Sequence, residues 1–538
     1  MQTPAAPPVA ARSRRRLYTL AGLFWLLLAV PFVASVGDRA LDDLWVTYRY
    51  AGNLLAGDGL VYDPGGNASE RVFGTTAPGH ALLLAAVAFL TRLPVPWAGT
   101  LVTAAALWAT AMLLLVEGAA RRRVPESLAA GTLLVAGRYA WIHNGAEAHV
   151  VTALLVAAAV LGRRRPAVAG LLAGLAVWCR PDAGLAVGIL GVLLWFEGRR
   201  LPWRYGVAGA ATILAGFGAA WVWFGTPLPT TLAAKRSHVT FMPGTWQGGW
   251  GIFAPAFRQL RQSYLGAAAG PFVALGAAGQ GVLLAAGGRA RRLLAANALA
   301  LAVAYPLLGV PFYTWYSLPV VAALLYGVVD LAGALARASG RRVAAWTARR
   351  RTADRARRRA PRLAAAAVAA ALLAPVAPAA VVAAWQHAAT PFPAVRYHLY
   401  HRTAEWIRER TPPDARLATV EVGVLGYYAE RPLVDLLGLV TPRSIERIAE
   451  RDLAGAFLAG DPDLFVVYDP MRGFQASIVH APWFTAGFRE AARFRNPQSG
   501  ELLRLYTRSP GVELPPADGV EGSEGRGGGG AATTRPSP

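Results

Sequence analysis

The chain has 538 residues, 55% of them hydrophobic, and a mean hydropathy of +0.36, which excludes an ordinary soluble protein of this length. Several stretches of about 17–25 residues with few charges are long enough to cross a bilayer, so the sequence predicts a polytopic α-helical membrane protein. The net charge of +23 does not indicate nucleic-acid binding, because the arginine clusters lie between apolar runs, as in cytoplasmic loops under the positive-inside rule.

The first 76 residues are predicted to hold one membrane span and one external loop. Residues 1–16 are basic and rich in proline and alanine, and we expect a disordered cytoplasmic amino terminus. Leu17–Val36 resembles a signal peptide, but it is long for one and further spans follow, so we expect a retained first span. Residues 37–76 are polar and contain Gly and Pro clusters, which predicts an extracytoplasmic loop.

A short amphipathic helix is predicted within this loop, lying on the membrane surface with Asp42 and Asp43 at its start. Two carboxylates where a first span meets water are costly to hold near lipid. A functional role is therefore favoured over helix capping, which needs only one such side chain. Two faces recur at helical spacing: Leu41, Trp45, Tyr48, Gly52 and Leu55 on one, and Asp42, Val46, Arg49 and Asn53 on the other.

Eleven further apolar segments follow the first span, so residues 17–390 are expected to form a membrane domain of about 11–13 helices. Twelve spans would return the chain to the side on which it began, whereas the amino terminus is expected inside and the C-terminal domain outside. One segment is therefore expected to be short or re-entrant, either Ala77–Leu90 or Leu128–Trp141. The other segments are Ala98–Val116, Val150–Leu161, Ala167–Trp178, Ala183–Phe196, Tyr205–Phe224, Leu265–Ala286, Leu293–Val310, Ser317–Leu335 and Leu363–Trp385.

The composition changes after residue 390, and residues 391–509 predict a small α/β domain outside the membrane. The stretch that begins at His401 indicates a helix, a strand, a short helix and a second strand, and Asp461–Asp469 indicates a buried strand. Residues 510–538 are of low complexity and are expected to be disordered. The chain has a single cysteine, Cys179, so no intrachain disulfide is possible.

Several motifs together resemble the GT-C integral-membrane glycosyltransferases. The likeness is to the bacterial branch of arabinofuranosyltransferases, mannosyltransferases and aminoarabinose transferases, and the motifs span most of the chain. They are "DDLWVTYRYAGNLLAGDGLVYDPGG" from Asp42, "ERVFGTTAPG" from Glu70, "GAE" at Gly145–Glu147, "RPD" at Arg180–Asp182, "FGTPLPTTLAAK" at Phe224–Lys235, "PFYTWYSLP" at Pro311–Pro319 and "GYYAERPLVDLLGLVTP" at Gly426–Pro442.

This resemblance implies transfer of one sugar from a polyprenyl-phosphate donor, with inversion, to an extracytoplasmic envelope glycan, lipid or protein. It also implies a location in the bacterial inner membrane, among membrane lipids. A first-loop acid would be the general base, because the attacking hydroxyl must lose its proton. Asp42 is slightly favoured over Asp43, because it shares a helical face with Arg49. A divalent metal stays open, since some relatives use one and others do not.

Lys235 is the only lysine in the chain. A compact ammonium group suits a phosphate oxygen, so Lys235 is a candidate for the donor phosphate, against the alternative of an ordinary surface lysine. Glu147 and Arg180 lie at predicted external ends of spans, where charges often form structural pairs with one another. Further candidates near the donor are His143, Arg71 and Tyr316, although an interfacial belt is the favoured interpretation of the aromatic cluster around Tyr316.

Two other functions fit parts of the sequence. A flippase or transporter of lipid-linked sugars would explain the spans and their charges, but it predicts repeated broken helices that the sequence lacks. A non-catalytic scaffold for envelope assembly is the third alternative.

Overall fold

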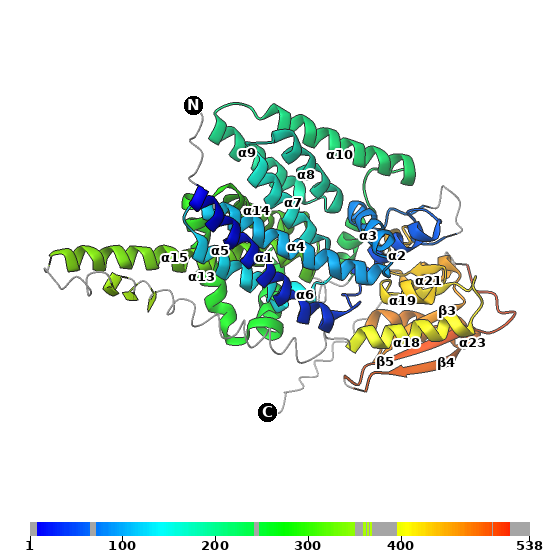
Figure 1. Cartoon of the computed structure of the whole chain (residues 1–538). Helices are drawn as coiled ribbons and strands as arrows, with labels where there is room; N and C mark the ends of the chain where they lie inside the picture. The colour runs from blue at the N-terminus through cyan, green and yellow to red at the C-terminus, as the bar shows by residue number, and fades with distance from the viewer. Residues whose placement is uncertain are drawn as a thin grey trace.

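The computed structural model describes residues 8–64, 71–241, 247–349, 359–361, 363–364, 366–367, 395–497 and 499–516. Most of the predicted last span, Leu363–Trp385, and most of the predicted tail, 510–538, lie outside the described residues. Figure 1 shows a helical bundle with the strands gathered in a smaller domain at one end.

The bundle consists of apolar helices of unequal length. By length and composition, six of the described helices can cross a membrane, and four further apolar helices have 10–17 residues. This confirms the predicted class of polytopic α-helical membrane protein. The bundle helices are α1 (Pro8–Val36), α3 (Pro78–Thr91), α4 (Val95–Ala120), α5 (Val124–Val135), α7 (Glu147–Leu161), α8 (Pro166–Cys179), α9 (Ala183–Gly198), α10 (Trp203–Phe224), α13 (Ala269–Ala286), α14 (Arg289–Leu308) and α15 (Leu318–Arg349).

Several boundaries differ from the sequence prediction, and α15 (Leu318–Arg349) extends well beyond the predicted Leu335. Helix α1 begins at Pro8, before the predicted Leu17, because the Ala- and Arg-rich residues that precede the apolar run are good helix formers. The predicted segment Leu128–Trp141 is broken, since α5 ends at Val135 and a separate short helix, α6 (Arg138–Ile142), follows Gly137.

Close helix contacts in the bundle rest on small residues. A side chain at Gly279 of α13 would overlap the backbone of Gly327 in α15, and a side chain at Gly170 of α8 would overlap the backbone of α10 at Tyr205. In a bilayer, where the hydrophobic effect does not drive helices together, such close backbone approach supplies much of the packing energy.

The arginine-rich turns gather at one end of the bundle. Arg289 at the start of α14 donates to Glu197 of α9 and to the Ala159 carbonyl of α7. Asp330 of α15, fully buried, lies 2.6 Å from Arg123 Nη1 and 3.1 Å from Arg291 Nε. These pairs tie the basic ends of five helices together.

Short helices and loops cover the opposite end. These elements are α2 (Leu44–Ala56), α6, α11 (Thr231–Phe241), the 3₁₀ turn η2 (Gly249–Ile252), α12 (Phe253–Gln259), the π-helical turn η3 (Leu260–Leu265) and the 3₁₀ turns η4 (Gly266–Ala268) and η5 (Thr314–Ser317).

The smaller domain begins with α18 (Val395–Arg410) and contains a five-stranded sheet in the order β2-β1-β3-β5-β4. Strand β1 pairs in parallel with β2 and β3, whereas β5 pairs antiparallel with β3 and β4. The remaining elements are β1 (Leu417–Thr419), α19 (Val424–Ala429), β2 (Leu433–Asp435), α20 (Arg443–Ala449), α21 (Leu453–Gly460), β3 (Leu464–Asp469), η6 (Gly473–Gln475), α22 (Ala476–Val479), α23 (Pro482–Gly487), β4 (Phe488–Arg495) and β5 (Leu502–Arg508). The predicted helix, strand, short helix and strand correspond to α18, β1, α19 and β2.

Helix α2 forms where the amphipathic helix is predicted, but it does not lie open on a surface. It packs between α3 on one side and α19 of the smaller domain on the other, and Trp45 and Tyr48 are fully buried. The hydroxyl group of Tyr48 fits only because Gly99 and Gly145 have no side chains at that point. The smaller domain therefore covers a helix that the sequence places on the membrane surface.

Candidate functional site

One small cavity, of about 40 Å³, lies where the loops of the bundle meet the smaller domain. Its walls come from the first loop, the starts of α3 and α7, the helix α11, the turn η5 and the loop after β2. The residues that line it are Asp43, Leu44, Val46, Thr47, Gly74, Thr75, Thr76, Glu147, Thr231, Lys235, Trp315 and Leu439.

Asp43 is the first-loop acid whose side chain lines this cavity. It occupies the N-cap position of α2, yet its side chain makes no capping hydrogen bond, and we find no hydrogen bond or ion pair to it from any described residue. Burial raises the pKa of Asp43 to about 6, partly offset by Lys235, while Glu421 raises it further. A carboxylate with this pKa and no internal partner can take a proton near neutral pH.

Asp42 is turned the other way. Its two carboxylate oxygens accept hydrogen bonds from the backbone N–H groups of Gly423 (3.1 Å) and Val424 (2.8 Å), at the start of α19. Burial and the charge of Glu421 raise the pKa of Asp42, and these two bonds lower it. The two acids, of which the sequence slightly favours Asp42 as the base, thus face different ways: Asp42 caps a helix of the smaller domain, and Asp43 lines the cavity.

Lys235 lies on α11 and is only 7% exposed. Its Nζ donates to the Tyr316 hydroxyl at 3.2 Å and lies 4.7 Å from the centre of the Tyr313 ring. Among the described residues no carboxylate lies within ion-pair distance of Lys235. A buried ammonium group that contacts aromatic rings and one hydroxyl is suited to an anionic ligand, because none of the described carboxylates forms an ion pair with it.

Glu147, at the first turn of α7, faces the cavity and is held by Arg180. The Arg180 Nη1 donates to Glu147 at 3.0 Å, its Nε donates to Asp182 at 2.9 Å, and its Nη2 donates to the Tyr305 hydroxyl at 2.7 Å. In this network Arg180 forms ion pairs with both Glu147 and Asp182. It orients Glu147 but leaves Arg180 itself behind the cavity wall.

The turn η5 supplies the aromatic wall. Trp315 lines the cavity, and Tyr316 stacks on Tyr305 with ring centres 4.7 Å apart. His143 does not reach the cavity, because its Nε2 pairs with the Thr314 hydroxyl and its Nδ1 with the Tyr139 carbonyl. His143 therefore braces the turn η5, in which the Tyr316 hydroxyl accepts a hydrogen bond from Lys235.

Two predicted donor ligands lie elsewhere. Arg49 is 5% exposed and donates to the Tyr62, Gly426 and Arg431 carbonyls and to Asp63, which places it in the contact between α2 and the smaller domain. The guanidinium group of Arg71 stacks over the ring of Trp223, 3.8 Å from its centre, outside the cavity lining. Neither side chain joins Asp43 and Lys235.

An apolar groove of about 520 Å³ lies next to the cavity and shares Thr76 with it. Helices α3, α8 and α10 form its walls, and Gly218 of α10 leaves room in it, because a Cβ atom there would meet nothing within 4 Å. The sequence did not reveal this groove, because its residues come from four segments and carry no polar motif. It is lined mainly by apolar residues, among them Leu60, Phe73, Leu82, Val177, Trp178, Phe217, Val222, Trp223 and Phe224.

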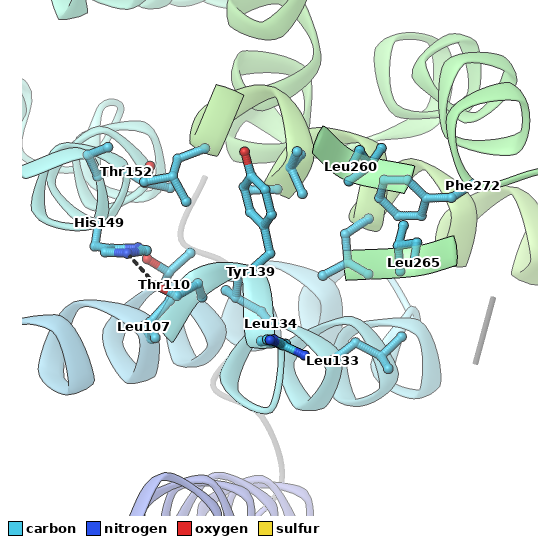
Figure 2. Close-up of a pocket in the computed structure, with 18 residues that line it drawn as sticks. Leu107, Thr110, Leu133, Leu134, Tyr139, His149, Thr152, Leu260, Leu265 and Phe272 are labelled. Carbon is cyan, nitrogen blue, oxygen red and sulfur yellow. Dashed lines mark hydrogen bonds between the residues drawn. The ribbon is translucent and has the colours of Figure 1, made fainter. Parts of the chain in front are cut away.

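A second apolar cavity, of about 100 Å³, lies between α4 to α7 and the helices α13 and α15 (Figure 2). Figure 2 shows Tyr139, His149 and Phe272 at its wall. The Tyr139 hydroxyl donates to the Thr314 carbonyl at 3.1 Å, so this cavity lies beneath the turn η5.

Metal ligands were left open by the sequence. Within the part of the chain that the structure describes, no group of three or more His, Cys, Asp or Glu side chains is placed to hold a metal ion. The cavity offers two carboxylates, of Asp43 and Glu147, and we derive no step through a metal.

Comparison with known proteins identifies the fold. A model of a domain of unknown function, DUF8728, matches residues 387–513, and no match is found among curated proteins. The structure of ArnT from Cupriavidus metallidurans bound to undecaprenyl phosphate matches with a TM-score of 0.52 and 15% identity, over 92% of this chain and 99% of that one. The archaeal oligosaccharyltransferase AglB from Archaeoglobus fulgidus, in complex with an inhibitory peptide and a dolichol-phosphate, matches with a TM-score of 0.53 and 12% identity, over 92% of this chain and 75% of that one.

These likenesses extend over most of both chains and show that this protein has the GT-C membrane fold. The family resemblance inferred from the sequence motifs is thus confirmed at the level of the fold. Together with the six long apolar helices, the fold identifies an integral membrane protein.

Proposed function

We propose that this protein is an inverting glycosyltransferase that moves one sugar from a polyprenyl-phosphate donor to a hydroxyl group of an envelope glycan, lipid or protein. The observation that carries the proposal is that one cavity brings together a carboxylate and an ammonium group, Asp43 and Lys235, neither of which forms an ion pair with any residue that the structure describes. Both solved relatives contain a polyprenyl-type phosphate, undecaprenyl phosphate in one and dolichol-phosphate in the other, which supports a donor of this class.

The reaction assigns one role to each group. The acceptor oxygen attacks the anomeric carbon as the bond from that carbon to the phosphate oxygen breaks, and the acceptor proton passes to Asp43. The prenyl phosphate leaves with one additional negative charge, which the ammonium group of Lys235 stabilises. Glu147, oriented by Arg180, is placed to accept hydrogen bonds from sugar hydroxyls.

The apolar groove is a suitable binding site for the prenyl chain of the donor. A prenyl chain that lies between α3, α8 and α10 would bring its phosphate to Thr76, where the groove and the cavity meet. Because such a chain would leave lipid rather than water, van der Waals packing against the groove would hold it, and the hydrophobic effect would contribute little.

The arginine pattern supports a location in the bacterial inner membrane with the site facing away from the cytoplasm. The basic turns Arg121–Arg123, Arg163–Arg165 and Arg199–Arg200 follow α4, α7 and α9, and the cavity lies at the opposite end of α7, where Glu147 lines it. By the positive-inside rule the cavity and the smaller domain would be extracytoplasmic.

The direct test is transfer by the purified protein. We expect radiolabelled sugar to move from a polyprenyl phosphate to an envelope extract, and Asp43→Asn to lower the rate by about 10²–10⁴-fold, the usual share of a general base. Asp58→Asn, which removes an exposed carboxylate of the same loop, is the matched control and should leave the rate unchanged. Full activity of Asp43→Asn would exclude the mechanism, and movement of lipid-linked sugar across proteoliposomes without a covalent product would favour a flippase.

A further inference from the structure

The first loop and the smaller domain are joined at a short segment, residues 421–426, which we term the docking segment. Asp42 accepts from the N–H groups of Gly423 and Val424, as described above. The Tyr62 hydroxyl donates to the Val422 carbonyl, and Arg49 Nη1 donates to the Gly426 carbonyl. All three first-loop side chains therefore bond to the backbone of the docking segment.

The contact at Gly423 leaves no spare room. A Cβ atom at this position would lie 1.8 Å from the backbone oxygen of Asp42 and 2.6 Å from its Cγ. Since Cβ atoms essentially never approach so closely, only glycine at position 423 allows the first loop and the docking segment to meet with both hydrogen bonds formed. The fit therefore depends on both residues.

Fixing Asp42 also fixes its neighbour. Consecutive Cα atoms lie about 3.8 Å apart, so the backbone of Asp43 can move little while the side chain of Asp42 is held. The Asp42 carbonyl accepts from the N–H of Trp45 at 2.9 Å, which starts α2 at the same point. The side chain of Asp43 has no hydrogen bond of its own among the described residues, so its direction depends on this backbone.

We propose that Asp42 is a positioning residue, through which the docking segment of the smaller domain holds Asp43 in its catalytic direction. This inference rests on the proposed function of Asp43 as the base. It explains why the two adjacent carboxylates are both useful: one binds the docking segment, and the other faces the cavity.

The expected effect falls on the chemical step. A base that is displaced by about 1 Å can cost about 10²-fold in rate, because proton transfer needs an aligned, short contact. Donor binding should change little, since Lys235 and the apolar groove are held by other elements. We therefore expect kcat to fall by about 10–100-fold while the donor KM stays within about twofold.

The experiment approaches the contact from both sides. Asp42→Ala removes the two hydrogen bonds, and Gly423→Ala pushes the docking segment away without altering any acidic residue. The control is Gly473→Ala in the same domain, where an added Cβ meets nothing within 4 Å. Asp42→Asn, which keeps the shape but can accept only one of the two bonds, serves if Asp42→Ala does not yield folded protein. Transfer rates, donor KM and melting temperature in detergent are measured for each variant.

The proposal is supported if Asp42→Ala and Gly423→Ala both lower kcat with little change in KM, and if the double variant is no worse than the poorer single one. It is overturned if Gly423→Ala keeps the full kcat while Asp42→Ala is inactive, because Asp42 would then act on substrate directly. It is also overturned if both variants keep the full kcat. Activity of Asp43→Asn would instead contradict the proposed function, so the two failures are distinct.

Discussion

Replacing Lys235 by methionine tests the electrostatic part of the mechanism most directly. The change keeps much of the volume and removes the one buried ammonium group of the cavity. Two unit charges about 4 Å apart interact with about 4 kcal/mol at an effective dielectric constant of about 20. Some of this attraction is already present in the bound donor, so we expect a loss of about 2–4 kcal/mol, which is about 30–1000-fold in kcat/KM.

The same variant should also shift the pH dependence. Lys235 lowers the pKa of Asp43, which burial raises to about 6. Because the base must be unprotonated, the wild-type kcat/KM should rise with pH through about 6, and Lys235→Met should move that rise to higher pH. A merely structural lysine would not produce this shift.

The assay is initial-rate transfer from a polyprenyl-phosphate sugar over pH 5–8, with melting temperature measured in parallel. Arg236→Met is the matched control, because Arg236 is the adjacent residue on α11 and is exposed. We expect the control to stay within about twofold of wild type. If Lys235→Met keeps more than about a third of kcat/KM and its pH profile does not move, the phosphate role is refuted.

Three further outcomes are expected. Gly218→Leu fills the apolar groove from α10 and should raise the KM for a long-chain donor by about fivefold or more, with kcat nearly unchanged. Gly206→Leu, at an open position of the same helix, is the control and should leave this KM unchanged. Equal KM values for the two variants would show that the donor lipid does not bind in this groove. Asp330→Asn leaves two buried arginines without their carboxylate and should cost about 3–5 kcal/mol, seen as a lower melting temperature. Asp43→Asn should have a higher melting temperature than wild type at pH 7 but not at pH 4. The pKa of Asp43 is raised from 3.8 to about 6 in the folded protein, so its ionisation lowers the stability of the wild type as pH rises through this range. Equal melting temperatures at pH 7 would contradict the burial of Asp43.

The sequence by itself determined the membrane class, the order of the elements and the chemical types of the site. Long apolar runs select helices in a bilayer, and helical spacing after Val36 selects α2, because both rules act over neighbouring residues. The rarity of lysine drew notice to Lys235, and the acid pair drew notice to the first loop. These inferences needed no knowledge of distant contacts.

Only the tertiary structure decided which way each side chain faces. The sequence separates Asp42 from Asp43 only by helical face, and their different directions arise because Asp42 meets the backbone N–H groups of Gly423 and Val424, 381 and 382 residues along the chain. Arg49 belongs to the contact with the smaller domain for the same reason, and the apolar groove forms from segments that no local pattern links. Periodicity assigns a face to each residue of a helix, but what packs against that face is set by long-range packing, which a local pattern does not contain.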